Sequence, residues 1–221
     1  MTSDTFQKRP QPVALAYLPT PFEALPALSQ HLGGPNIYIK RDDCTGLAGG
    51  GNKTRKLEYL MADAIKCGAD TIVTVGATQS NHVRQTCAAC AKLGLKAHVL
   101  LQKEVVRDAE YARNGNFMLN GLMGATVHEM PADIDLNARG LEFTRKLSSQ
   151  GCKAYFIPIG GSSPIGGFGY RGCAREIVEQ AEMAAIDINA IYVASGSFGT
   201  QAGLVVGVQE CQKDIPITAL A

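Results

Sequence analysis

The chain has 221 residues, of which 46% are hydrophobic, and carries a formal net charge of +1. This composition is ordinary for one or two small globular domains. The near-neutral charge argues against nucleic acid or a membrane surface as a partner, and no apolar run is long enough to span a bilayer. The polar residues 1–11 lack the apolar core of a signal peptide, so we expect a cytoplasmic protein.

The seven cysteines are scattered along the chain and odd in number, which favours reduced thiols. Cys87 and Cys90 have the spacing of a metal or redox pair. They lie within a helical pattern, however, and no second Cys or His pair completes a zinc site. We therefore expect these two residues to be small members of a buried core, and we expect no metal site.

Strand and helix patterns alternate along the chain. The strand-like runs are short and mostly apolar or β-branched, and they cover residues 37–39, 71–75, 96–101, 126–128, 154–159, 190–194 and 215–219. Helical patterns lie between them, near residues 53–67, 82–93, 109–121, 135–149, 170–184 and 200–212. Apolar strands of this kind are typical of a parallel sheet covered on both faces, so the sequence predicts an α/β fold.

The first glycine-rich turn, GGGNKTRK at residues 49–56, places Lys53 between a strand and a helix. Such a turn directs backbone N–H groups at a small anion. A nucleotide-binding P-loop is excluded, because Leu47 and Asn52 stand where that motif needs glycine. Two interpretations remain open. Lys53 either belongs to a solvated basic helix start, which the helix dipole disfavours, or is a low-pKa amine that condenses with a cofactor aldehyde.

Two further polar turns follow predicted strands. Residues 76–82, GATQSNH, offer hydroxyl, amide and helix N-terminal donors to a carboxylate or a ring oxygen, although Ser80 or Asn81 could simply cap the helix. Residues 195–200, SGSFGT, could fold into a concave phosphate-binding nest. Phe198 is the one large apolar residue among its glycines and hydroxyl residues.

A fourth glycine-rich segment contains Gly167, Gly169 and Gly172, which formally match the dinucleotide-binding pattern G-x-G-x-x-G. That pattern needs its first glycine at the end of a strand, whereas Pro164 and several loop residues intervene here. We expect these glycines to serve helix packing. A nicotinamide-dependent oxidoreductase is kept as an alternative that rests on this segment alone.

Three motifs in order, GGNKTRK around Lys53, QSNH at 79–82 and SGSFGTQAG at 195–203, resemble the pyridoxal-phosphate enzymes of fold type II. Within these they are most similar to the group that holds aminocyclopropane-carboxylate deaminase, D-cysteine desulfhydrase and L-cysteate sulfo-lyase. The resemblance runs from about residue 19 to the last residue.

The resemblance implies two doubly wound, three-layer lobes with parallel central sheets. Residues 1–54 and 165–221 would form an incomplete large domain, and residues 55–164 a small domain inserted in it. Family members are longer, and this chain stops within a strand-like run. We therefore expect a partial sequence that lacks the C-terminal part of the large domain, from a homo-oligomeric enzyme.

The resemblance also implies roles for individual residues. Lys53 would form the Schiff base with pyridoxal 5'-phosphate and act catalytically together with Ser80, while Asn81 would bind the ring oxygen of the cofactor. The substrate would meet the four residues Gln79, Ser80, Asn81 and His82. The cofactor phosphate would be held by Gly196, Ser197, Phe198, Gly199 and Thr200. Family members usually have glycine at the position of Phe198, which puts the backbone conformation there in question.

The implied reaction is α,β-elimination on a β-substituted amino acid, with Lys53 as general base and pyruvate and ammonium as products. Residues 41–48 and Thr54 look most similar to L-cysteate sulfo-lyase, and hydroxyls of Thr45, Thr54 and Thr78 could donate to a sulfonate. D-cysteine desulfhydrase is the second choice, and aminocyclopropane-carboxylate deaminase the third. A cofactor-binding protein without catalytic activity is a further alternative.

Overall fold

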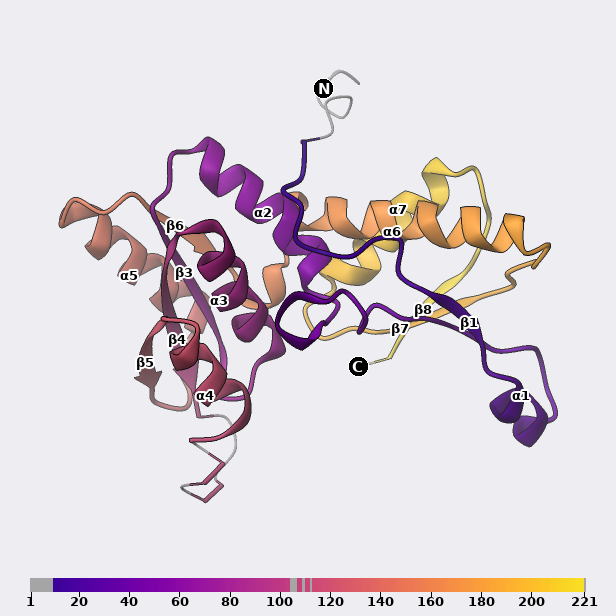
Figure 1. Ribbon diagram of the computed structural model, residues 1–221, viewed down its shortest axis with the longest axis horizontal. Coiled ribbons are helices and arrows are strands. Elements are labelled where there is room, and N and C mark those ends of the chain that lie inside the picture. Colours follow the sequence, from indigo (N-terminus) through magenta and orange to yellow (C-terminus); the bar gives the residue numbers. More distant parts are fainter. Residues whose placement is uncertain (1–9, 104–106, 109, 112, 221) are drawn as a thin grey trace.

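The computed structural model describes residues 10–103, 107–108, 110–111 and 113–220. Figure 1 shows a sheet with its helices beside a second group of helices and strands. In the first half of the chain the elements are β1 (Phe22–Ala24), α1 (Pro26–Leu32), β2 (Tyr38–Lys40), α2 (Thr54–Lys66), β3 (Thr71–Ala77), α3 (Asn81–Leu93) and β4 (Lys96–Gln102). The second half contains α4 (Gly115–Leu122), β5 (Thr126–Met130), α5 (Leu136–Ser149), β6 (Ala154–Ile157), α6 (Pro164–Met183), β7 (Ile191–Ala194), α7 (Gly199–Glu210) and β8 (Ile217–Leu220).

The four-stranded sheet is parallel, in the order β5-β4-β3-β6. One face packs against α5, where Val73 and Leu100 meet Leu136 and Leu147. The other face is covered by α2, α3 and α4. This three-layer arrangement explains the apolar strands, since both faces of the sheet are removed from water.

The second group consists of α6 and α7 packed on the parallel pair β7–β8. Ile191, Val193 and Ile217 face the helices, whereas Tyr192 and Leu220 are exposed on the opposite face. Strands β1 and β2 form a separate antiparallel pair. The predicted α/β class is confirmed, and the second lobe is represented in the described residues by these two strands and their helices.

Helices α6 and α7 approach each other closely because glycines line their contact. A Cβ atom added at Gly203 would lie 2.5 Å from the Cβ of Tyr170, and one added at Gly207 would lie 2.6 Å from the Cβ of Ala174. The contact therefore brings the start of α7, where the loop of residues 195–200 ends, beside the first half of α6.

All seven predicted strands are present with shifted ends, but β1 and α1 were not predicted from the sequence. Helix α6 begins at Pro164 rather than near residue 170, because Ser163 caps it by accepting a hydrogen bond from the backbone N–H of Gly166 and proline suits the first turn. Helix α4 begins at Gly115, and residues 109 and 112 of the longer predicted helix lie outside the described residues.

Two short motifs singled out in the sequence lie within helices α3 and α6. Cys87 and Cys90 are buried and free, and burial raises the pKa of Cys87 to about 12, so their role in the core is confirmed. Gly167, Gly169 and Gly172 lie inside α6, and a side chain at Gly169 would strike the carbonyl of Arg55. Gly169 therefore serves helix packing, whereas a Cβ atom added at Gly167 would meet open space, and none of the three glycines lies at a strand-end dinucleotide turn.

Among the described helices, none combines the length and apolar character needed to cross a membrane.

Candidate active site

Lys53 lies at the start of α2, at the end of a loop whose backbone is fixed by its own hydrogen bonds. The hydroxyl of Thr45 accepts a hydrogen bond from the backbone N–H of Gly51 (2.9 Å) and donates one to the Gly51 carbonyl (2.8 Å). Gly50 and Gly51 have φ values of 83° and 137°, which L side chains rarely adopt. The glycines are therefore needed to bring the chain into the helix at Lys53.

The Lys53 amine lies 3.2 Å from Oδ1 of Asn52, and burial lowers its pKa. One turn further along α2, Lys56 is buried and donates to the carbonyl of Gly160 (3.2 Å). Burial, together with the charge of Lys53, lowers the pKa of Lys56 to about 7. Within the described part of the chain, neither lysine forms an ion pair with a carboxylate. Two adjacent, partly desolvated amines without counter-charge favour an anionic ligand.

The turn at Gly160 brings the first and third motifs together. A Cβ atom added at Gly160 would lie 2.6 Å from Oγ of Ser197 and 3.7 Å from Cε of Lys53. The neighbouring Ser162 hydroxyl is 2.7 Å from the Ser197 hydroxyl. Lys53 and the loop of residues 195–200 are therefore neighbours in space, although they lie far apart in the sequence.

The loop of residues 195–200 has the features of an anion-binding nest. It ends at the N-terminus of α7, where backbone N–H groups lack partners within the helix. The buried Ser195 hydroxyl has no hydrogen-bond partner among the described residues, and Thr200 is also buried. Phe198 has a φ of 58°, in the left-handed region, and its side chain is 62% exposed. Phe198 therefore has the positive φ that glycine adopts more readily at this position.

The QSNH segment forms the turn between β3 and α3, and hydrogen bonds from Asn116 of α4 hold it in place. Asn116 donates from its backbone N–H to Oε1 of Gln79 (2.8 Å) and from its side chain to Oδ1 of Asn81 (2.9 Å). This arrangement leaves the Nδ2 donor of Asn81 available to a ligand oxygen. Ser80 caps α3, because its Oγ accepts from the N–H of Val83 (3.3 Å). No sequence signal pointed to Asn116, since its role depends on tertiary contact.

The ring of His82 is held inside the fold. Oγ1 of Thr74 is 2.9 Å from both Nε2 of His82 and the carbonyl oxygen of Ile157. Because a carbonyl only accepts, the threonine hydroxyl donates to Ile157, and Nε2–H of His82 donates to the hydroxyl oxygen. Burial, and then the charges of Lys53 and Lys56, lower the pKa of His82 to about 3. His82 is therefore a neutral residue beneath the turn at Gly160 and Gly161.

The three threonines expected to donate to a sulfonate use their hydroxyl hydrogens within the protein. Thr45 donates to Gly51, as described above, and Thr54 donates to Oε1 of Gln85 (2.9 Å). Thr78 donates to the carbonyl of Gln102 (3.3 Å). These contacts remove the physical argument that favoured a sulfonate leaving group.

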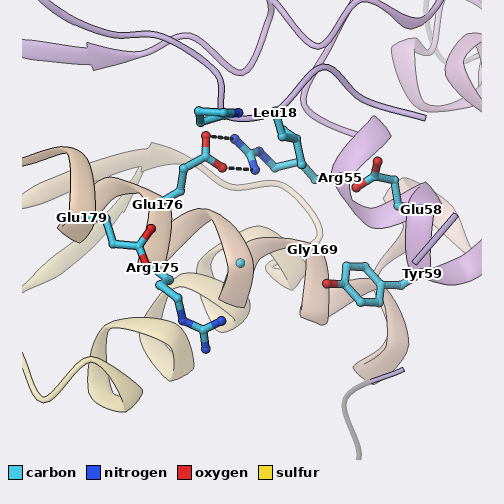
Figure 2. A pocket seen from close by; sticks show the side chains of 10 residues that line it. Leu18, Arg55, Glu58, Tyr59, Gly169, Arg175, Glu176 and Glu179 are labelled. Atoms are coloured by element: carbon cyan, nitrogen blue, oxygen red, sulfur yellow. Dashed lines mark hydrogen bonds and ion pairs between the residues drawn. The ribbon is translucent and has the colours of Figure 1, made fainter. Parts of the chain in front are cut away.

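Behind the lysines, a buried ion-pair network joins α2 to α6. Arg55 donates to both carboxylate oxygens of Asp42 (2.9 and 2.8 Å) and to Glu176 (2.8 Å). Burial alone would lower the pKa of Arg55, but these carboxylates raise it. Figure 2 shows Arg55 and Glu176 facing each other at a hollow of about 350 Å³. None of the residues expected to bind the cofactor or the substrate lines this hollow, so it is separate from the candidate active site around Lys53.

The amine of Lys53 and the nest at the start of α7 meet at Gly160, and together they would suit a ligand that has an aldehyde and a phosphate. A family model described as pyridoxal-phosphate dependent enzyme matches residues 13–220. The chain belongs to this family. The expected fold type and the expected cofactor, pyridoxal phosphate, are thereby confirmed.

Two relatives in the family carry a more specific name. The chain is 49% identical over 192 residues to D-cysteine desulfhydrase of Serratia proteamaculans, and 48% identical over 200 residues to D-cysteine desulfhydrase of Salmonella typhi. These matches cover 86% and 90% of this chain but only 58% and 60% of the relatives. The chain therefore spans less than two thirds of their length.

Solved structures of other proteins share the fold of this chain. The chain superimposes on a crystal structure of an ACC deaminase homologue with a TM-score of 0.84 at 41% identity, covering 95% of this chain and 62% of the other. A fungal L-serine ammonia-lyase from Rhizomucor miehei superimposes with a TM-score of 0.73 at 18% identity, covering 93% and 59%. The second similarity shows the shared fold alone.

Proposed function

We propose that this chain carries the lysine and the phosphate nest of a pyridoxal-phosphate-dependent lyase that performs α,β-elimination on a β-substituted amino acid. The observation that carries the proposal is the approach of Lys53 and Ser197 to the same point above Gly160. A cofactor whose phosphate is held at residues 196–200 could therefore place its aldehyde at the Lys53 amine.

Each expected residue then has a role that its surroundings allow. When bound, pyridoxal phosphate supplies an electron sink for the α-carbon of the substrate. Lys53, with its lowered pKa, would accept the α-proton. The Nδ2 group of Asn81 would donate to the cofactor ring oxygen, and the Ser80 hydroxyl can still donate to a substrate carboxylate. We keep Gln79 and His82 as proposed neighbours of the substrate, with His82 in an inner position.

The phosphate nest is proposed to consist of Gly196, Ser197, Phe198, Gly199 and Thr200. Lys56 was not expected in the site, yet it is a second buried cation beside Lys53 without a carboxylate partner among the described residues. We propose that Lys56 stabilises the bound phosphate through its charge. The run of basic residues at the start of α2, which opposes the helix dipole, was the signal in the sequence.

We propose D-cysteine as the substrate, with sulfide, pyruvate and ammonium as products. Two relatives at 48–49% identity bear the name D-cysteine desulfhydrase, and the threonines that had favoured L-cysteate are bound within the protein. L-cysteate, which was the first candidate substrate from the sequence alone, becomes the second candidate. Aminocyclopropane-carboxylate follows, supported by the similarity to an ACC deaminase homologue.

We propose a large domain of residues 1–54 and 165–221 and a small domain of residues 55–164. The separate apolar cores of the four-stranded sheet and of the α6–α7 group support this division. We also propose a cytoplasmic homo-oligomer, whose mass light scattering would measure.

The test is an assay of the purified protein with D-cysteine and with L-cysteate, in which sulfide and sulfite are measured separately. We expect sulfide and pyruvate in equal amounts from D-cysteine, and no product from the Lys53→Ala variant. The Lys66→Ala variant is a control, because Lys66 is an exposed lysine at the end of the same helix. Sulfite as the main product would replace D-cysteine with L-cysteate, and full activity of Lys53→Ala would refute the lyase proposal.

A further inference from the structure

Tyr170 of α6 touches the backbone immediately before Lys53. Its side-chain oxygen is 3.1 Å from the carbonyl oxygen of Asn52 and 3.0 Å from Oδ2 of Asp42. The residue is 3% exposed. Burial, and then the charge of Asp42, raise its pKa well above the ordinary value. The hydroxyl therefore keeps its proton and shares it between two acceptors.

Asn52 is linked to the reactive amine in two ways. Its carbonyl group belongs to the peptide bond that joins it to Lys53, so the tyrosine hydroxyl restrains the orientation of that peptide. Its side-chain Oδ1 accepts a hydrogen bond from Nζ of Lys53 (3.2 Å). Any rotation of the Asn52 peptide would move both the backbone and the side-chain support of the amine.

The anchor behind Tyr170 is rigid. Asp42 receives two hydrogen bonds from Arg55, at 2.9 and 2.8 Å, and Arg55 is in turn paired with Glu176 of α6. Charge-assisted bonds of this kind, with both partners largely removed from water, hold a carboxylate in one place. Figure 2 shows the Arg55–Glu176 part of this network between α2 and α6.

The Cβ atom of Tyr170 lies against the helix that begins at the phosphate nest. A Cβ atom added at Gly203 of α7 would lie 2.5 Å from the Cβ of Tyr170, so there is no room between the two helices at this point. Nζ of Lys56 lies 5.9 Å from the centre of the ring. One residue thus contacts the peptide before Lys53, the second buried lysine and the helix that begins at the nest.

We propose that Tyr170 is a positioning residue, which sets the place of the Lys53 amine relative to the phosphate nest through the Asn52 peptide. This inference rests on the proposed function, since it concerns the same lysine and the same cofactor. Tyr170 itself does not contact the reacting atoms.

The test compares Tyr170→Phe with Tyr155→Phe. The control is matched, because the Tyr155 hydroxyl also donates to an aspartate, Oδ2 of Asp63 (2.7 Å), but at the outer end of α2. We expect Tyr170→Phe to raise the dissociation constant for pyridoxal phosphate about three- to tenfold, as for the loss of one hydrogen bond. We also expect weaker visible circular dichroism of the bound cofactor, whereas Tyr155→Phe should match the wild type in both measurements.

A double-mutant cycle then tests whether Tyr170 acts on Lys53 through Asn52. If Tyr170 acts through Asn52, Tyr170→Phe should change the dissociation constant less in an Asn52→Ala background, where the link to Nζ is gone. Equal behaviour of the two phenylalanine variants, with wild-type cofactor binding, would overturn the positioning role and leave the proposed function intact. A wild-type protein that binds no pyridoxal phosphate would instead overturn the proposed function, and the inference with it.

Discussion

The side chains of Lys53 and Ser197 converge on one point above Gly160. An added Cβ atom at that glycine would lie 3.7 Å from Cε of Lys53 and 2.6 Å from Oγ of Ser197. Gly160 has a φ of 62°, which a side chain would strain in addition to the crowding. The absence of a side chain at residue 160 is therefore a requirement for the site and not only for the turn.

Gly160→Ala should accordingly weaken the binding of pyridoxal phosphate by at least about tenfold, since the new methyl group displaces the Ser197 hydroxyl. Equilibrium titration of the cofactor, followed by absorbance, measures the effect. Gly33→Ala is the matched control, because Gly33 has a φ of 63° and open space around it. Both variants should lose about 1–2 kcal/mol of stability from backbone strain. Wild-type cofactor affinity in Gly160→Ala would contradict the described geometry.

The lowered pKa of Lys56 predicts that the free energy of unfolding depends on pH. Its pKa falls from 10.5 to about 7 on folding, so the unfolded chain binds more protons between these two pH values. The free energy of unfolding should therefore rise with pH across this window, with a contribution from Lys56 of up to about 1.4 kcal/mol per pH unit. In Lys56→Met this contribution should disappear, as urea denaturation at pH 7, 8 and 9 would show. Lys66→Met is the control, and parallel pH profiles for wild type and Lys56→Met would refute the prediction.

Much of this site was predictable because its chemistry is local in the sequence. Lys53, the QSNH turn and the nest at residues 195–200 each combine glycines and short polar residues at a strand-to-helix junction, where parallel sheets place ligands. Asn116 and Tyr170 were not predictable, because both act through contacts with residues distant in the sequence. The short strand β1 and helix α1 were missed because three and seven residues give little periodicity.

Phe198 offers a test of backbone strain within the nest. A φ of 58° costs a non-glycine residue about 1 kcal/mol, and the exposed ring regains little of it through burial. Phe198→Gly should therefore retain cofactor binding and raise the free energy of unfolding by up to about 1 kcal/mol, as chemical denaturation would measure. Phe198→Ala removes the ring but keeps the Cβ atom, so it should gain nothing. Equal stability of the two variants would show that the left-handed conformation is not strained.

The network behind the lysines should contribute strongly to stability. Arg55→Met would leave the carboxylates of Asp42 and Glu176 without their shared partner, and breaking a buried pair in this way costs about 3–5 kcal/mol. Thermal or urea denaturation would detect the loss. Arg139→Met is the comparison, because Arg139 pairs with Glu142 on an exposed face and should change stability by less than about 1 kcal/mol. Similar losses in the two variants would contradict the described burial of Arg55.

We propose that Lys53, rather than its neighbour Lys56, joins pyridoxal phosphate. Reduction of the cofactor-loaded protein with borohydride fixes the cofactor covalently to its lysine, and mass spectrometry of the digested protein identifies the position. We predict that the label is found on Lys53, and that Lys53→Ala takes up none while Lys56→Met is still labelled at Lys53. A label on Lys56, or no label on the wild-type protein, would contradict the account.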